Sequence, residues 1–334
     1  MTKRFTPKWV AEKTGIQEAT IERLSKAFAG ADPGLALGGG IPSQTGNATY
    51  ELVAINLLNY IAGNVGRTVR FGNRSHLVKA KPFRELKKLV EEMKEEKIEV
   101  LLVNDLNPVY FLPQAAGFEE ALQKVPFLVS FSSYMDETTE KCHLVLPNHT
   151  PLESWGDYEI REGLHGLIQP TMKPLYQTKA LGDVLLSTLR KVDEKLVKDF
   201  PEKSFQEYLK NQWKLLQTKL SPEKSFEEFW EKALRQGGVF EDWREKNIEL
   251  QDRVFGLSFK ETEMIVADSS SFDLSVYPSI HCYDGRGANK PWLQEQPDPI
   301  TQIVSDTWGE MHPQTAGKLR IKAGDLIQLK SASG

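Results

Sequence analysis

Apolar positions in the first part of the chain follow two spacings, one typical of helices and one typical of buried strands. Residues 7–29 predict two short helices, residues 48–62 an apolar helix, and residues 82–97 a charged amphipathic helix. Leu35–Leu37 and Val100–Val103 are instead short, continuous apolar runs. Such runs are typical of strands in a parallel sheet, where both faces are covered.

The alternation of helices and strands continues to about residue 190. A helix is predicted near 114–123, and strands at Phe127–Phe131 and His143–Leu146. This order predicts the α/β class, with residues 1–190 forming a doubly wound αβα domain around a parallel sheet. Ligands of such sheets bind at the carboxyl ends of the strands, which makes three loops the first candidates for a site: residues 38–47, 104–110 and 131–138.

The character of the chain changes twice in its second half. Residues 191–261 predict a helical insertion or side layer whose aromatic side chains pack on a neighbouring layer, with a partner-docking surface as the alternative. Residues 262–334 predict the start of a β-barrel. We expect the chain to be partial, because its last predicted strand lies next to its end. The predicted barrel strands are Glu263–Ala267, Phe272–Val276, Ile300–Val304 and Asp325–Leu329.

Composition excludes several classes of function. A net charge of −4 and a pI near 6.0 argue against a general nucleic-acid binder. No apolar stretch has the ~18 residues that a membrane span needs, and the first residues carry no signal-like apolar core. The two cysteines, Cys142 and Cys282, form no Cys-x-x-Cys pair. We therefore expect no iron–sulfur cluster held by this chain alone, and no cysteine ligand to a metal.

The glycine-rich turns do not match known phosphate loops. A Walker loop that includes Gly66 needs glycine at Ile61 and lysine at Arg67, and a dinucleotide fingerprint starting at Gly38 needs glycine at Ser43. Ordinary turns and a helix C-cap are the favoured interpretation, and hydrolysis of a nucleoside triphosphate is disfavoured.

The segment Asn104–Pro108 follows a predicted strand and allows two interpretations. Its amide and carboxylate groups could bind the edge of a nucleobase or a ribose. Alternatively, Asn107 caps a helix and Pro108 is the first helical residue, which the residues alone favour.

Other motifs point to no hydrolase. None of the six histidines lies in a His-Glu-x-x-His arrangement, and no Gly-x-Ser-x-Gly elbow occurs. His143 and His149 could converge in space, although a hydrogen-bonding role is favoured. Trp155–Gly163 is dense in charge and glycine, which predicts a solvated surface loop, with a ligand-facing loop as the alternative.

Several motifs taken in order resemble the molybdopterin oxidoreductase family, over residues 1–190 and 262–334. The two motifs that best carry the resemblance lie in the last segment, at Tyr283–Glu295 and Ile321–Leu329. The others are Leu35–Gly40, Leu57–Gly66, Asn107–Pro108, Thr138–Pro147 and Leu152–Gly156.

This resemblance implies a molybdopterin guanine dinucleotide cofactor, with any iron–sulfur clusters outside this chain. It implies no catalytic or metal-binding residue here. Active members usually place an acidic residue where Ser132 stands and another where His143 stands. The residues that match the family's binding positions for the guanine and ribose are Gly39, Gly40, Asn104, Asn107, Pro108 and Ser132.

Where the chain departs from the active members, it most resembles the molybdopterin-like subunit of alternative complex III and its polysulfide-reductase-like relatives. They imply a scaffold without its own metal, bound to other subunits of a membrane-bound redox complex on the periplasmic face of the cytoplasmic membrane. One alternative is part of an active reductase of polysulfide, thiosulfate or arsenate that holds two pterin dinucleotides. Another is a non-catalytic binding or assembly module.

Overall fold

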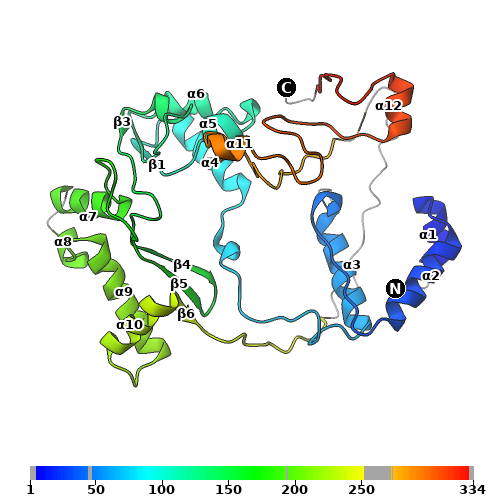
Figure 1. The fold of residues 1–334 in the computed structure, drawn as a ribbon, viewed down its shortest axis with the longest axis horizontal. Helices are drawn as coiled ribbons and strands as arrows, with labels where there is room; N and C mark the ends of the chain where they lie inside the picture. The colour runs from blue at the N-terminus through cyan, green and yellow to red at the C-terminus, as the bar shows by residue number, and fades with distance from the viewer. Residues whose placement is uncertain (1–4, 44–46, 193–194, 252–271, 273, 331–334) are drawn as a thin grey trace. The chain divides into compact units, whose positions relative to one another are not determined.

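The computed structural model describes residues 5–43, 47–192, 195–251, 272 and 274–330 (Figure 1). The chain divides into two compact units. One comprises Met1–Ser75, Arg161–Gly163 and Glu241–Tyr277, and the other His76–Ile160, Leu164–Phe240 and Pro278–Gly334. The division at residues 190 and 261 stays a prediction.

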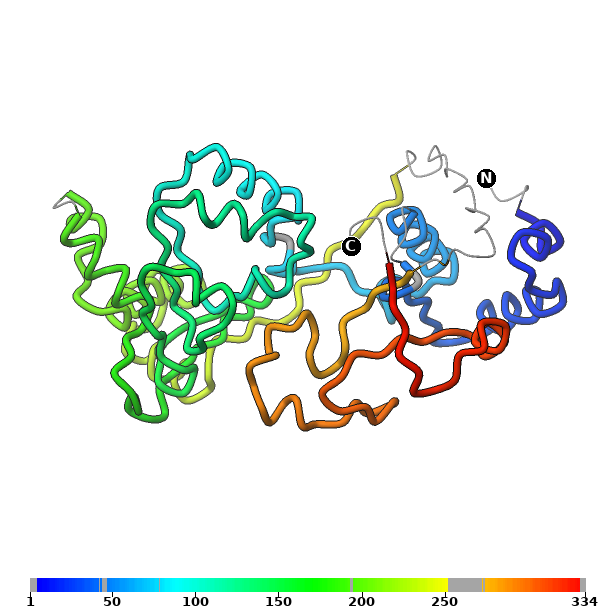
Figure 2. Tube along the Cα trace, turned by 90° about the horizontal axis from the view of Figure 1, so that it is seen from above, coloured from blue at the N-terminus to red at the C-terminus, as the bar shows by residue number. Residues whose placement is uncertain are grey.

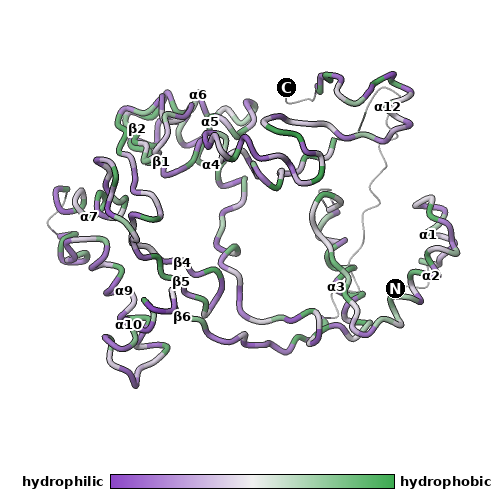
Figure 3. Tube along the Cα trace, in the orientation of Figure 1, coloured by the Kyte–Doolittle hydropathy of each residue, from purple (hydrophilic) through white to green (hydrophobic). Residues whose placement is uncertain are grey.

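The first unit contains the predicted amino-terminal helices α1 (Pro7–Thr14), α2 (Glu18–Gly30) and α3 (Ala48–Ile61). The hydroxyl of Thr6 caps α1 by accepting the N–H of Trp9, and Pro7 supplies the first helical residue. Helix α3 is apolar over most of its length (Figure 3). The sequence therefore predicted these three helices correctly.

The predicted strand Leu35–Leu37 is wrong, because no neighbouring strand pairs with this segment in the described residues. The buried side chain of Asn59 takes the place of a strand. Its Oδ1 accepts the N–H of Ala36 at 2.9 Å, and its Nδ2 donates to the carbonyl of Ala36 at 2.8 Å. A side-chain amide carries the same donor and acceptor as a peptide group, so it satisfies the extended backbone without a sheet.

The second unit contains the predicted parallel sheet, in the order β1-β2-β3. Val100 pairs with Phe127, and Val129 pairs with Leu144. The elements of this region are α4 (Phe83–Lys94), β1 (Val100–Val103), α5 (Pro108–Phe111), η4 (Gln114–Ala116), α6 (Phe118–Leu122), β2 (Phe127–Ser130), η5 (Thr139–Lys141) and β3 (Leu144–Val145). The three strands predicted here are confirmed, and the fold is a mixed α/β fold with a parallel sheet.

Helices α4 and α6 cover one face of this sheet. Met93 of α4 and Leu122 of α6 pack in one buried cluster with Leu128 of β2. On the other face, Val100 and Leu102 are about half exposed, at 52% and 49%. Cover on both faces, as a doubly wound sheet requires, stays a prediction.

A second sheet corrects the prediction for Trp155–Gly163. Most of this segment forms strand β4 (Gly156–Arg161), followed by β5 (Leu164–Ile168) and β6 (Gly238–Phe240). Gly163 has φ +81° and turns the chain between β4 and β5. The charged residues suggested a loop, but a strand with one solvated face also carries charge.

Two helices pack on this second sheet, α9 (Phe205–Leu220) and α10 (Phe226–Gln236). They follow α7 (Leu181–Val192) and α8 (Leu196–Asp199) in the chain. Trp213 of α9 and Trp230 of α10 are buried with Leu167 of β5. This packing confirms that the aromatic side chains form an internal core.

The described residues 274–330 contain none of the predicted barrel strands. Their trace runs through the orange and red part of the tube in Figure 2. They contain the short helices α11 (Pro291–Gln294) and α12 (Pro313–Leu319), and Glu263–Ala267 lies outside the described residues. Within 300–304, the carboxylate of Asp298 accepts the N–H groups of Ile300 and Thr301, which bends the segment into a turn. The barrel is not confirmed. None of the described helices has the length and apolarity to cross a membrane.

Candidate functional site

The carboxyl edge of the parallel sheet carries two polar segments. Residues 104–107 follow β1, and residues 132–138 follow β2. The pairing of β1 with β2 continues one residue past the end of β2, because the N–H of Phe131 donates to the carbonyl of Val103 at 2.9 Å. Asp105 has φ +53°, which turns the chain sharply after β1. The two segments therefore start side by side.

Asn107 and Pro108 occupy the predicted N-cap and first position of α5, but the side chain of Asn107 does not cap the helix. Its Oδ1 accepts from the backbone N–H of Thr138 at 3.2 Å and from its hydroxyl at 2.8 Å. Its Nδ2 donates to Oε2 of Glu137 at 2.6 Å. The hydroxyl of Thr138 in turn accepts the N–H of Val109 at 3.1 Å. The helix is thus capped from the other segment.

Ser132 is also bonded inside the protein. It is 4% exposed, its hydroxyl donates to Oδ2 of Asp136 at 3.1 Å, and its oxygen accepts the N–H of Tyr134 at 3.1 Å. The other oxygen of Asp136 accepts the N–H of Thr139 at 2.8 Å. The Thr139 hydroxyl lies 2.8 Å from that of Ser130. Each of these buried polar groups has a partner within the chain.

The structure brings four of the six predicted site residues to one unit. Asn104 is exposed, Asn107 is half-buried, and Pro108 and Ser132 are buried. Gly39 and Gly40 lie in the other unit with φ +98° and +73°, and a Cβ on either would meet nothing within 4 Å. These angles confirm that the glycines form a turn. Their place relative to the sheet edge stays a prediction.

Electrostatics around the edge follow from the same contacts. The hydrogen bond from Asn107 is the main cause that lowers the pKa of Glu137. Burial, and then the carboxylate of Asp136, raise the pKa of the Cys142 thiol. A thiol held in its neutral form is a poor nucleophile and a poor metal ligand. Among the described residues, no group of three His, Cys, Asp or Glu side chains could hold a metal ion.

Thr138 and Asp136 are the residues that sequence reasoning missed. Both lie inside a loop that was a first candidate, and Thr138 is fully buried while Asp136 is 7% exposed. Spacing gives no signal for them, because their partners lie on a different loop. The only available signal was the density of short hydroxyl and carboxyl side chains after a strand, which is typical of side-chain to backbone hydrogen bonding.

The two histidines near this region have separate hydrogen bonds. The N–H of Leu128 donates to Nδ1 of His143 at 3.0 Å, and the N–H of His143 donates to the carbonyl of Leu128 at 3.0 Å. His143 thus extends the pairing of β3 with β2. Nδ1 of His149 lies 2.7 Å from the hydroxyl of Thr178. These contacts confirm the hydrogen-bonding interpretation.

The Tyr283–Glu295 motif lies beside α5. The guanidinium of Arg286 donates to both carboxylate oxygens of Asp284, at 2.9 and 2.8 Å. The hydrogen bond from Arg286 is the main cause that lowers the pKa of Asp284. A Cβ on Gly285 would lie 2.8 Å from the ring of Tyr110, so this turn contacts the helix that Asn107 begins.

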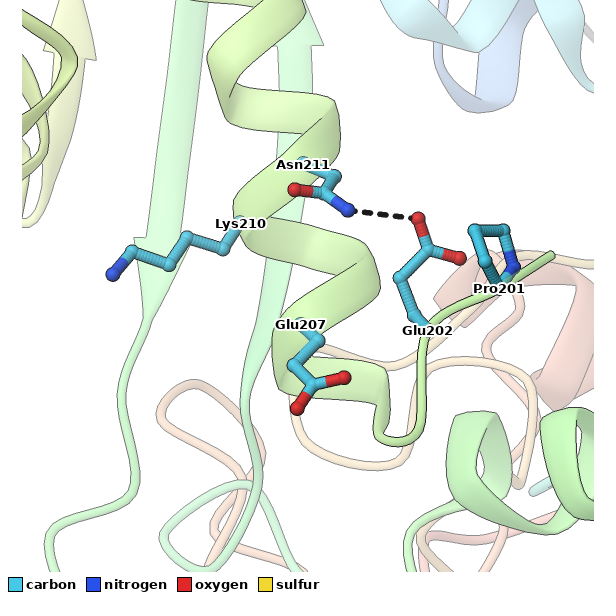
Figure 4. Close-up of a pocket in the computed structure, with 5 residues that line it drawn as sticks. All are labelled: Pro201, Glu202, Glu207, Lys210 and Asn211. Atoms are coloured by element: carbon cyan, nitrogen blue, oxygen red, sulfur yellow. Dashed lines mark hydrogen bonds between the residues drawn. The ribbon is translucent and has the colours of Figure 1, made fainter.

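Two surface cavities lie elsewhere in the same unit. One, of about 310 Å³, is lined by residues at the start of α9 (Figure 4). There Nδ2 of Asn211 donates to Oε1 of Glu202 at 2.9 Å, while Lys210 points away from that pair. The other, of about 330 Å³, includes Leu128 and His143. Neither cavity includes a predicted site residue.

The parallel sheet defines a mixed α/β fold, and the edge at which ligands of such sheets are predicted to bind lies after β1 and β2. Comparison with known families then identifies part of the chain: residues 38–185 match the molybdopterin oxidoreductase family. The match falls on the family that the sequence motifs resemble. A molybdenum–pterin cofactor is the characteristic group of this family.

Three relatives share part of the sequence. The menaquinone reductase molybdopterin-binding-like subunit of Nitratidesulfovibrio vulgaris is 32% identical over 222 residues, which cover 62% of this chain and 31% of the relative. The molybdopterin-containing subunits of the arsenate respiratory reductases of Chrysiogenes arsenatis and Shewanella sp. strain ANA-3 are 27% and 25% identical, over 53% of this chain and 26% of each relative. The chain spans less than a third of the length of these relatives.

The described side chains do not fit a guanine dinucleotide as they stand. Guanine presents N–H donors on its pairing edge, and a carboxylate is the acceptor that pairs best with them. Ser132 offers no carboxylate, and the nearest one, Asp136, is only 7% exposed and already accepts a hydrogen bond on each oxygen. The burial of Asp136 therefore keeps its remaining lone pairs from a guanine base.

Proposed function

We propose that this protein is a scaffold part of a molybdopterin-oxidoreductase-like subunit in a respiratory electron-transfer complex, without a metal of its own. The observation that carries the proposal is the internal pairing of Asn107 with Thr138 and of Ser132 with Asp136. Polar groups that already bond to one another gain little net free energy by exchanging those bonds for bonds to a cofactor.

The relatives support this proposal. The relative with 32% identity is named a molybdopterin-binding-like subunit of a menaquinone reductase. By analogy, the chain contacts other subunits of a membrane-bound redox complex at the periplasmic face of the cytoplasmic membrane. Electrons then pass through iron–sulfur clusters outside this chain.

A second candidate is part of an active reductase that binds molybdopterin guanine dinucleotide. The observation that favours it is the identity of 27% and 25% with molybdopterin-containing subunits of arsenate respiratory reductases. In this case Asn104 and Asn107 would contact the guanine and ribose, and the cofactor would supply the oxygen-atom or electron-transfer chemistry. A non-catalytic binding or assembly module is the third candidate.

Calorimetric titration of the purified chain with GDP tests the proposal, since GDP represents the guanine end of the cofactor. A scaffold gives no binding heat up to about 1 mM GDP, in a sample whose folding is confirmed by circular dichroism. Submillimolar binding that disappears in an Asn107→Ala variant would instead establish a working nucleotide site and favour the reductase.

A further inference from the structure

Basic side chains are concentrated where the chain enters α4. Residues 76–88, which we call the basic segment, comprise the short helix η3 (His76–Lys79), a connection and the first turns of α4. The segment contains five basic residues and one acidic residue, although the whole chain carries a net charge of −4. The basic residues, all exposed, are Lys79, Lys81, Arg84, Lys87 and Lys88.

The stability of α4 does not account for this charge. The N-terminus of a helix carries a partial positive charge, so acidic side chains are favoured there. Arg84 nevertheless occupies the second position of α4, Lys87 and Lys88 follow in the next turn, and Glu85 is the one acidic residue of the first turn. Most of the charge on α4 is therefore ordered against the helix dipole. The acidic residues gather in the second half of the helix and directly after it: Glu91, Glu92, Glu95 and Glu96.

The basic side chains remain available although three of them form ion pairs. A carboxylate oxygen lies 3.7 Å from Nζ of Lys79, 3.7 Å from Nε of Arg84 and 3.5 Å from Nζ of Lys88. These three side chains are between 65% and 83% exposed. Exposed ion pairs contribute little free energy, so another anion can replace these partners at low cost.

An exposed leucine lies among these charges. Residues three apart share one side of a 3₁₀ helix, and both His76 and Lys79 of η3 approach the carboxylate of Glu159 in β4, at 3.8 and 3.7 Å. The side of η3 that faces β4 is thus polar. Leu77 is left 74% exposed, next to the basic residues.

An exposed aromatic ring lies at the start of α4. Phe83 is 49% exposed, and Nζ of Lys87 lies 5.4 Å from the centroid of its ring. A lysine in this position covers apolar surface with its methylene groups and keeps its charge in water. Exposed aliphatic and aromatic side chains among lysines are typical of segments that lie in the interface of a membrane.

We propose that the basic segment binds the surface of a bilayer that contains anionic phospholipids, with Leu77 and Phe83 entering the headgroup region. Basic clusters of about four to eight residues bind such surfaces. Four of the five basic residues are lysines, and interfaces between proteins are depleted in lysine and enriched in arginine. A lipid surface is therefore favoured over an acidic protein. The inference goes beyond the proposed function, because it holds equally for a scaffold and for an active reductase.

Co-sedimentation of the full chain with lipid vesicles tests the proposal. The vesicles contain either phosphatidylcholine alone or equal parts of phosphatidylcholine and phosphatidylglycerol. The natural sequence is compared with the double variant Lys81→Glu/Lys87→Glu and with the control Lys214→Glu/Lys219→Glu. The control changes the net charge by the same amount, and its lysines are exposed and flank the exposed Leu215 of α9.

The natural sequence should bind the mixed vesicles, and added salt should weaken this binding because it screens the charges. The double variant in the basic segment should bind at least about tenfold more weakly, while the control should bind like the natural sequence. Absence of binding to the mixed vesicles at low salt would overturn the proposal. Equal losses in the two double variants, or equal binding to phosphatidylcholine alone, would overturn it as well. Binding to polyglutamate without binding to vesicles would assign the segment to an acidic protein instead.

A second variant covers the case in which the charge-reversed protein does not fold, as checked by circular dichroism. Leu77→Asn removes apolar surface and no charge. It should weaken binding to the mixed vesicles about fivefold and leave the salt dependence unchanged. An unchanged affinity in Leu77→Asn would show that this side chain does not enter the headgroup region, and would overturn the proposed mode of binding.

Discussion

The backbone N–H of Val109 donates to the hydroxyl of Thr138 at 3.1 Å, so α5 receives its N-terminal cap from a residue 29 positions later in the chain. The same hydroxyl donates to Oδ1 of Asn107 at 2.8 Å. One buried side chain therefore fixes both the start of the helix and the orientation of the amide before it. The loops after β1 and β2 form one hydrogen-bonded structure.

Replacing Thr138 tests this link. Thr138→Val keeps the shape of the side chain but leaves the N–H of Val109 and one lone pair of Asn107 without partners. It should lower the free energy of unfolding by about 1–3 kcal/mol, as measured by urea denaturation. Thr138→Ser retains the hydroxyl and should lose clearly less. Equal losses in the two variants would show that the methyl group, and not the hydrogen bond, matters at this position.

The sequence predicted the parallel sheet well, because its strands are short apolar runs that alternate with helices, and successive strands in this order pair in one parallel sheet. It also predicted that Asn107 and Pro108 begin a helix, since this preference is local. It failed to predict that Thr138 would cap that helix. A hydrogen bond between residues 29 positions apart leaves no trace in spacing, and the capping preference of Asn107 suggested that its own side chain would suffice.

The errors in the sheet assignments have a common cause. A strand exists only through its partner, and a single sequence does not show which segments pair. Leu35–Leu37 looked like a strand but bonds to the side chain of Asn59. Gly156–Arg161 looked like a loop, yet it pairs in the sheet with β5. In the described residues from 274 to 330, isolated β-like runs likewise remain without strand partners.

Asn59 should be essential to the first unit. Asn59→Ala removes both hydrogen bonds to Ala36 and a third, from Nδ2 of Asn64, at 3.0 Å. Because Asn59 is only 2% exposed, this variant should lose about 1–3 kcal/mol of its free energy of unfolding. Hydrogen exchange at the Ala36 amide should become faster. Asn56→Ala on the exposed side of α3 is the control and should leave that exchange rate unchanged. An unchanged rate in Asn59→Ala would contradict the strand-replacing role of this amide.

Trp213 should contribute most to the packing of the helical layer. It is 1% exposed, and its ring centroid lies 5.8 Å from that of Trp230 in an edge-to-face arrangement. Its Nε1 donates to Oδ2 of Asp157 of β4 at 2.9 Å. Trp213→Ala should lower the free energy of unfolding by about 3–5 kcal/mol, as measured by thermal or chemical denaturation. Trp292, which is 85% exposed, supplies the control. Comparable losses in Trp213→Ala and Trp292→Ala would mean that this core is not the source of stability.

Glu153 should make the stability of the second unit depend on pH. Its carboxylate accepts the N–H of Leu175 at 2.9 Å and that of Thr150 at 2.9 Å, and these bonds lower its pKa, the bond from Leu175 most. A carboxyl group with a lowered pKa in the folded state contributes its full stabilisation above its unfolded pKa, about 4.3 for glutamate. That contribution is lost as the pH falls through the lower folded-state pKa. The urea midpoint should therefore fall between about pH 5 and pH 3, and Glu153→Gln should flatten this part of the curve. The exposed Glu120→Gln variant should retain the full slope, and a slope that is equally steep in Glu153→Gln would assign the acid sensitivity to other carboxylates.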